Sequence, residues 1–245
     1  MISPAKLNML RRTRVKIHKA LAQAGLLSAE LVLVFVACLI SLVIFSWMVK
    51  KVIINKQDEF DFAVFQWMET YINPINTSLM QGITFLGTHT FLIPANLLLT
   101  AYFLFIRKHR WYSIKVASIA LSSTAMMFLL KNFFSRERPL IPLLRPAMGY
   151  SFPSGHSMMS FAFYGLLIYL TYKYMKRPAL KVATIILLLL LIFLIGISRI
   201  YLRVHYASDV LAGFSVGIIW LVFSIGLLNR LEYYSKRNLQ EVVEE

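Results

Sequence analysis

The chain has 245 residues, of which 58% are hydrophobic, and its mean hydropathy is +0.66. An ordinary soluble domain has an apolar share nearer half, so this composition predicts a membrane protein and argues against a soluble globular class. The formal net charge of +15 raises the question of nucleic-acid binding. The basic residues, however, lie in the connectors between apolar runs rather than in one stripe, so we expect no nucleic-acid partner.

Six apolar runs are long enough to cross a hydrocarbon core, the shorter ones with help from flanking Lys and Arg side chains. These runs are Leu31–Val49, Thr88–Ile106, Tyr112–Leu130, Ser157–Tyr172, Val182–Ser198 and Val210–Asn229. The first run is longer than the apolar part of a signal peptide, and no clear cleavage site follows, so we expect a retained span. It holds the single cysteine, Cys38, which we expect to be a buried packing thiol.

The longest connector, residues 50–87, carries aromatic and aliphatic side chains among polar neighbours. This pattern predicts an amphipathic helix at the membrane interface, with Asn73-Pro74 as its break and Gly87 at the turn into the second span. We see no repeat and no linker, so residues 1–245 are expected to form one domain. The predicted fold is an all-α bundle of six transmembrane helices with this interfacial helix between spans one and two.

The basic residues predict the topology. If the N-terminus is cytoplasmic, the inner connectors hold 17 of the 26 basic residues, as the positive-inside rule requires. Segments 1–30 and 230–245 are then both cytoplasmic. Six of the nine remaining basic residues fall in 131–155 and 199–209, on the outer side. The positive-inside rule does not explain why these six basic residues lie on the outer side.

Three segments at the outer ends of spans three to six carry these charges. They are KNFFSRERP (131–139), PSGH (153–156) and SRIYLRVHYASD (198–209). Each alone has a structural explanation, because a terminal Lys can anchor a span, Pro-Ser-Gly can cap a helix, and His205 and Asp209 can form a local pair four residues apart. Together they supply cations, a glycine turn at a helix N-terminus and two histidines. Those groups suit a phosphoryl site.

The ordered set K-x6-RP, PSGH and SR-x5-H-x3-D resembles the signature of the type 2 phosphatidic acid phosphatase superfamily, membrane relatives of the vanadium haloperoxidases. The resemblance implies that His205 is the nucleophile, that Asp209 orients it, and that His156 protonates the leaving oxygen and then activates water. The groups it implies for holding the phosphate oxygens are Lys131, Arg138, the Ser154 hydroxyl, the Gly155 backbone and Arg199. Arg203 stands where many members have a small residue, and its role stays open between substrate contact and interfacial anchoring.

We therefore expect an enzyme that hydrolyses a lipid phosphate or pyrophosphate, without metal or other cofactor and without an obligatory protein partner. Phosphatidylglycerol phosphate, phosphatidic acid, undecaprenyl pyrophosphate and a lipid A phosphate all fit a site at the outer membrane edge. The expected location is the bacterial inner membrane, with the site facing the periplasm or exterior and both termini cytoplasmic. Two other classes share some of these features: a transporter or lipid-binding protein without hydrolytic activity, and a haloperoxidase, whose soluble scaffold conflicts with six apolar spans.

Overall fold

All of the secondary structure in the described part of the chain is helical, as expected. The computed structural model describes residues 30–56, 58–140, 142–143 and 149–244, and side chains up to Arg237. The chain divides into two compact units, residues 1–40 and 41–245, each described by itself. In the first unit residues 30–40 are helical. Most of the expected cytoplasmic segment 1–30 lies outside the described residues.

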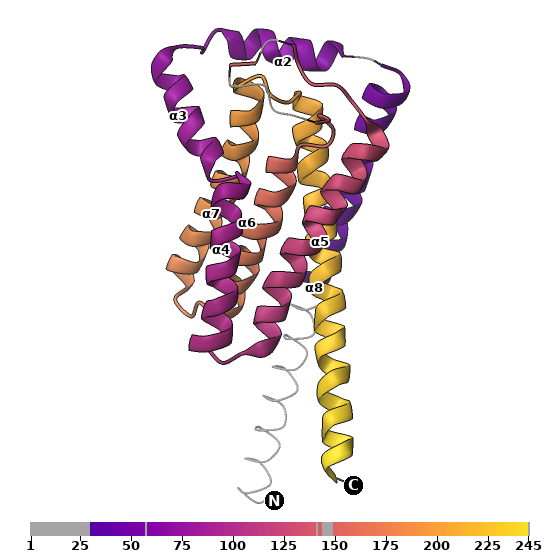
Figure 1. The fold of residues 1–245 in the computed structure, drawn as a ribbon, viewed down its shortest axis with the longest axis vertical. Coiled ribbons are helices and arrows are strands. Elements are labelled where there is room, and N and C mark those ends of the chain that lie inside the picture. Colours follow the sequence, from indigo (N-terminus) through magenta and orange to yellow (C-terminus); the bar gives the residue numbers. More distant parts are fainter. Residues whose placement is uncertain (1–29, 57, 141, 144–148, 245) are drawn as a thin grey trace, which may run out of the picture. The chain divides into compact units, whose positions relative to one another are not determined.

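The second unit contains the end of that first helix and all of the later ones. The first helix ends in the π-helix η1 (Val49–Ile54). The others are α2 (Glu59–Glu69), α3 (Pro74–Phe85), α4 (His89–Ala101) with its π-helical end η2 (Tyr102–Ile106), α5 (Arg110–Phe134), α6 (Gly155–Tyr174), α7 (Pro178–Tyr201) and α8 (Ala207–Glu244). Figure 1 shows α2 running across one end of the bundle formed by α4 to α8. Its position at a membrane interface stays a prediction.

The connector before α4 holds one more helix than the sequence pattern predicted. The chain breaks at Asn73-Pro74 as expected, but α3 begins there, because the Asn73 side chain accepts a hydrogen bond from the Asn76 backbone N–H at 2.8 Å and Pro74 fits the first helical position. The expected turn at Gly87 is also present. A Cβ at Gly87 would lie 2.6 Å from Ile195 Cγ2, so only glycine fits this close approach to α7.

The expected count of six spans is not confirmed. Five helical segments are long and apolar enough to cross a membrane, and α6 is not among them. α6 packs against α4, α5, α7 and α8, and its buried side chains include Ser157 and Ser160. A helix enclosed by other helices faces protein rather than lipid, so it can carry polar side chains that a lipid-facing helix cannot.

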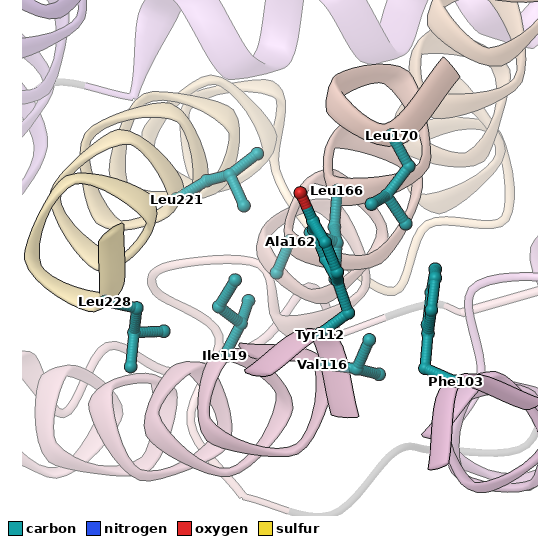
Figure 2. Close-up of a cluster of buried hydrophobic side chains, with 9 residues drawn as sticks. All are labelled: Phe103, Tyr112, Val116, Ile119, Ala162, Leu166, Leu170, Leu221 and Leu228. Carbon is teal, nitrogen blue, oxygen red and sulfur yellow. The ribbon is translucent and has the colours of Figure 1, made fainter. Parts of the chain in front are cut away.

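One hydrophobic cluster joins α5, α6 and α8 (Figure 2). Val116 and Ile119 of α5, Leu166 of α6 and Leu221 of α8 point toward one another and are nearly inaccessible. Tyr112 and Phe103 close the cluster toward η2. This core fixes the helices whose ends carry the three motifs.

Two glycines of α8 let its backbone approach α6. A Cβ at Gly213 would lie 2.6 Å from the Ser154 backbone oxygen, and a Cβ at Gly217 would lie 3.2 Å from that of Met158. Their spacing is the small-xxx-small pattern with which membrane helices pack closely. Because Ser154 stands at the start of α6, this contact also sets where the PSGH turn meets the start of α8.

Candidate active site

The three motifs meet around one cavity of about 960 Å³. Six of the eight residues proposed from the sequence line it: Lys131, Arg138, Gly155, His156, Arg199 and His205. The other two, Ser154 and Asp209, are fully buried beside it. Residues up to 78 positions apart in the chain are thus brought to one end of the bundle.

His205 and Asp209 form a pair, though not on one helical face. His205 lies in the loop before α8, and Asp209 lies in the first turn of that helix. Asp209 Oδ2 lies 3.4 Å from His205 Nδ1 and also accepts a hydrogen bond from the Tyr206 backbone N–H at 2.9 Å. This second contact caps α8. It holds the carboxylate in place relative to the histidine.

The hydrogen bonds of His205 assign its tautomer. Nε2 lies 3.2 Å from Arg138 Nη1, and because a guanidinium can only donate, Nε2 must accept. Nδ1 therefore carries the proton and faces Asp209. The ring presents an unprotonated nitrogen at the cavity, which is the state required for attack on phosphorus.

Burial, followed by the positive charges of Arg199, Lys131 and Arg138, lowers the pKa of His205 well below its ordinary value. Both causes disfavour the imidazolium ion. Burial also lowers the pKa of Arg138, without bringing an arginine near deprotonation at neutral pH. His205 is therefore neutral at physiological pH while the cation beside it stays charged.

The three cations of the cavity are held by backbone or hydroxyl oxygens. Lys131 donates to the Tyr150 carbonyl at 2.5 Å, Arg138 to the Val204 carbonyl at 2.8 Å, and Arg199 to Thr84 Oγ1 at 2.8 Å. None of these contacts neutralises a charge. The buried Nε of Arg199 has no hydrogen-bond partner. This end of the cavity is therefore prepared for an anion with several oxygens.

His156 and Gly155 occupy the first turn of α6. The Nε2 atom of His156 is buried and has no hydrogen-bond partner. A Cβ on Gly155 would lie 2.5 Å from Met127 Sδ, so any larger residue would have to displace the Met127 side chain where the helix N-terminus meets the cavity. The free N–H groups at that end of a helix favour anions.

Ser154 is placed differently from the other phosphate-binding candidates. Its hydroxyl caps α6, accepting hydrogen bonds from the Ser157 backbone at 3.4 Å and the Ser157 hydroxyl at 3.0 Å. Ser154 is not among the described residues that line the cavity. Its contact with phosphate stays a prediction.

Three further residues, not identified from the sequence, complete the surroundings of Asp209. Ser151 Oγ donates a hydrogen bond to Asp209 Oδ2 and lies 3.3 Å from His205 Nδ1. Arg136 donates to Asp209 Oδ1 at 2.7 Å, and Asp61 of α2 binds Arg136. Arg136 could have been noticed as an extra cation two residues before Arg138. Asp61 gave no such signal, because only the fold brings α2 to this site.

Arg203 has a positive φ of 54° and pairs with Glu69 of α2 at 3.3 Å. It is not among the described cavity-lining residues. In the described part of the chain, no group of three or more His, Cys, Asp or Glu side chains is placed to hold a metal ion.

Beyond its cationic end the cavity becomes apolar. It follows α4 through Ile93 and Leu97 to Thr100, and its other wall is formed by α5 residues such as Ala117 and Leu121. The rise of an α-helix is about 1.5 Å per residue, so the length from His89 to Thr100 corresponds to roughly 16 Å along α4. The cavity thus joins a site for an anion to an extended apolar channel.

Comparison with known proteins agrees with this geometry. The model of the PAP2 superfamily matches residues 111–233. The chain belongs to the PAP2 superfamily. Phosphatidylglycerophosphatase B of Bacillus subtilis (strain 168) is 31% identical over 170 residues, which are 67% of this chain and 81% of the relative. The bacitracin transport permease protein BcrC of Bacillus licheniformis is 35% identical over 104 residues, 42% of this chain and 46% of that protein.

Two solved structures share the fold. The PAP2-type phosphatidylglycerolphosphate phosphatase from Bacillus subtilis superposes with a TM-score of 0.68 at 27% identity, covering 80% of this chain and 96% of that one. LpxE of Aquifex aeolicus gives a TM-score of 0.54 at 27% identity, with coverage of 67% and 94%. The chain is therefore an integral-membrane PAP2 phosphatase, a hydrolase of phosphoric esters. It belongs to a phosphatase family that acts on lipid phosphate substrates in a membrane.

Proposed function

We propose that the chain removes a phosphate group from a lipid headgroup through a phosphohistidine at His205. Nε2 attacks phosphorus, and the bond between phosphorus and the lipid oxygen breaks. His156 gives a proton to that oxygen. Water then attacks the phosphohistidine, His156 accepts its proton, and inorganic phosphate leaves. Asp209 supports the positive charge that the His205 ring acquires when Nε2 bonds to phosphorus.

The cations stabilise the phosphoryl group during both steps. Lys131, Arg138 and Arg199 are already aimed into the cavity, so little reorganisation is needed when charge develops on the transferring oxygens. Arg138 would exchange its contact with His205 Nε2 for a phosphate oxygen, which frees the nucleophile. In this proposal the cationic side chains do the neutralising work that Mg²⁺ does in many phosphoryl-transfer enzymes.

The observation that carries the lipid part of this proposal is the continuity of the cavity. The cationic end holds both histidines, and the apolar end runs between α4 and α5. A phosphate attached to a hydrocarbon chain has this distribution of charge and apolar surface. A small water-soluble phosphate ester would leave the apolar end unfilled.

Phosphatidylglycerol phosphate is the first substrate to test. A relative that matches 67% of this chain is named phosphatidylglycerophosphatase B. The experiment is phosphate release by purified protein in mixed micelles, with phosphatidylglycerol phosphate, phosphatidic acid, undecaprenyl pyrophosphate and a lipid A phosphate compared by kcat/KM. We expect the highest kcat/KM for phosphatidylglycerol phosphate. Release from none of the four lipids would contradict the proposal and favour a transport or lipid-binding role.

We further propose that α6 is the sixth crossing, that both termini are cytoplasmic, and that the cavity opens toward the outer face of the bacterial inner membrane. Support comes from the basic residues, which are concentrated in alternate connectors. An even number of crossings is required for both termini to share one side.

A further inference from the structure

Arg136 is a cation that the reaction described above does not use. It is not among the described residues that line the cavity, and its side chain is 10% exposed. Its Nη1 donates to Asp209 Oδ1 at 2.7 Å. Its Nη2 donates to Asp58 Oδ1 at 2.8 Å and to Asp61 Oδ2 at 2.9 Å. The guanidinium also lies 4.0 Å from the centre of the Tyr206 ring. Both terminal nitrogens of Arg136 thus donate to carboxylates, and one of them binds the Asp209 oxygen that does not face His205.

Asp61 connects this arrangement to α2. Its side chain is 1% exposed and accepts the Ser208 backbone N–H at 2.8 Å and the Ser208 hydroxyl at 2.6 Å. The N–H belongs to the first turn of α8, so Asp61 places a negative charge at that helix N-terminus. A buried carboxylate is stable only when paired and hydrogen-bonded. Arg136 and Ser208 satisfy it, and α2 is thereby fixed to the start of α8.

The consequence for Asp209 is that its two oxygens are assigned to different partners. Oδ1 faces Arg136, whereas Oδ2 faces His205, Ser151 and the Tyr206 backbone N–H. A carboxylate held on one oxygen cannot rotate to turn both oxygens away from the imidazole. The contact between Oδ2 and His205 Nδ1, at 3.4 Å, therefore depends on what holds Oδ1 as well as on the Ser151 and Tyr206 donors to Oδ2.

The charges around Arg136 bear on the same contact. Burial opposes its charge, but Asp209 and Asp61 outweigh that effect and raise the pKa of Arg136, so it is a permanent cation. An isolated cation beside Asp209 would partly cancel the negative electrostatic potential that the carboxylate exerts at His205. The negative charges of Asp58 and Asp61, which also bind the guanidinium, offset this effect. Asp209 then keeps its capacity to stabilise positive charge on the His205 ring.

We propose that Arg136, held by Asp61 of α2, is the positioning residue of the His205–Asp209 pair, and that α2 thereby forms part of the catalytic apparatus. This inference rests on the proposed phosphohistidine mechanism. Arg136 acts through Asp209 and touches neither the substrate nor the reacting atoms.

The test compares Arg136→Ala, Arg136→Lys and Asp61→Asn with two controls on the neighbouring ion pair, Arg203→Ala and Glu69→Gln. That pair also joins α2 to the loop before α8 but does not reach Asp209. We expect Arg136→Ala to lower kcat by roughly 10–100-fold, by analogy with the loss when residues that orient the ligands of a metal site are replaced, with KM changed less than about threefold. Asp61→Asn and Arg136→Lys should show smaller losses, and the controls should keep the wild-type kcat.

Two further measurements separate positioning from other roles. The rate of phosphoenzyme formation should fall equally for a lipid phosphate and for para-nitrophenyl phosphate, because nucleophilic attack rather than leaving-group protonation is impaired. In a double-mutant cycle, Arg136→Ala should cost almost nothing once Asp209→Asn is present, because both changes remove the same support. The size-exclusion elution profile and thermal unfolding identify any variant that fails to fold. If Arg136→Ala does not fold, Arg136→Lys and Asp61→Asn are used for the test instead.

A raised KM with unchanged kcat would show that Arg136 binds substrate, and additive losses in the cycle would show that it acts independently of Asp209. Either result overturns the inference. So does full kcat in the folded Arg136 variants of an active enzyme. Failure of the proposed function would look different, because the unsubstituted protein would then form no phosphohistidine or release no phosphate.

Discussion

At the scale of single residues, two histidines in one cavity are distinguished by their partners. His205 has a carboxylate and a serine hydroxyl at Nδ1, so its other nitrogen is presented unprotonated. The buried Nε2 of His156 has no hydrogen-bond partner and is available to exchange a proton with a ligand. This difference favours His205 as nucleophile and His156 as acid and base.

His205→Ala should form no phosphoenzyme, because it removes the proposed nucleophile and leaves His156, which the proposal assigns to proton transfer. His156→Ala should lose roughly 10²–10⁴-fold in rate with a lipid alkoxide leaving group, and much less with a good leaving group. Asp209→Asn should show a loss of activity between those of His205→Ala and His156→Ala. The measurement is rapid-quench trapping of acid-labile, base-stable phosphoprotein. Phosphoprotein in His205→Ala, together with none in His156→Ala from an activated substrate, would reverse the two roles.

The lowered pKa of His205 predicts the acid limb of the pH profile. In the proposed mechanism the neutral ring is the nucleophile, so activity should persist below pH 6.5, near which an ordinary histidine becomes protonated. Arg138→Gln removes one of the charges that lower this pKa, so the pKa should rise and the acid limb should move to higher pH. The profile of kcat/KM for both proteins measures this, since it reports groups of the free enzyme. A limb that stays in place in the variant would contradict the prediction.

At the scale of elements, close packing and the apolar channel depend on small side chains. Gly213 and Gly217 bring α8 against the α6 backbone, and Ala117 and Ala120 leave space between α4 and α5. The two cases give different predictions, one for stability and one for substrate affinity.

Gly213→Ala should destabilise the protein by about 1–3 kcal/mol, the usual range for overpacking, because the added Cβ would lie 2.6 Å from a backbone oxygen that cannot move aside. Gly226 on the same helix is the matched control, since nothing lies within 4 Å of its Cβ position. Gly226→Ala should be neutral or stabilising by up to about 1 kcal/mol from helix propensity. Thermal unfolding in detergent compares the two, and equal stability would refute the role of Gly213.

Ala120→Phe should fill part of the channel and raise KM for a lipid phosphate by roughly tenfold, or about 1.4 kcal/mol. Its activity on para-nitrophenyl phosphate, which does not need the channel, should stay near wild type. Ala183→Phe is the control, because Ala183 is exposed on α7 and does not line the cavity. Equal effects on both substrates would contradict a lipid channel at this place.

At the scale of the whole second unit, the fold gathers the chemistry at one end of the bundle. The end of α5, the start of α6 and the loop between α7 and α8 meet there, and α2 crosses the same end (Figure 1). In the proposed topology this end faces outward. A lipid phosphate could then reach the cations while its hydrocarbon part stays at membrane depth.

The topology can be tested with single cysteines in a Cys38→Ser background. Glu59→Cys lies on α2 and Lys108→Cys on the connector before α5, and both positions are exposed. A membrane-impermeant thiol reagent applied to intact cells should label the first and spare the second, which should react only after the cells are opened. The opposite labelling pattern would place the cavity on the cytoplasmic side.

The sequence alone determined the helical class, most of the span positions and six of the residues that line the cavity. Apolar runs of membrane length must become helices because their backbone groups have no other partners in lipid. Three motifs rich in Lys, Arg and His are too costly at a membrane edge without a function. The short spacing between His205 and Asp209 even placed that pair correctly, although the first of them precedes the helix.

Only the tertiary structure decided which side chains do structural work and which reach the cavity. Ser154 became a helix cap because α6 begins at the next residue, and α6 was enclosed by neighbours and so could carry buried serines. Asp61 met Arg136 across 75 positions of sequence. Such contacts follow from how helices pack, because packing depends on the shapes of both partners at once. A local pattern of residues carries information about only one of the two.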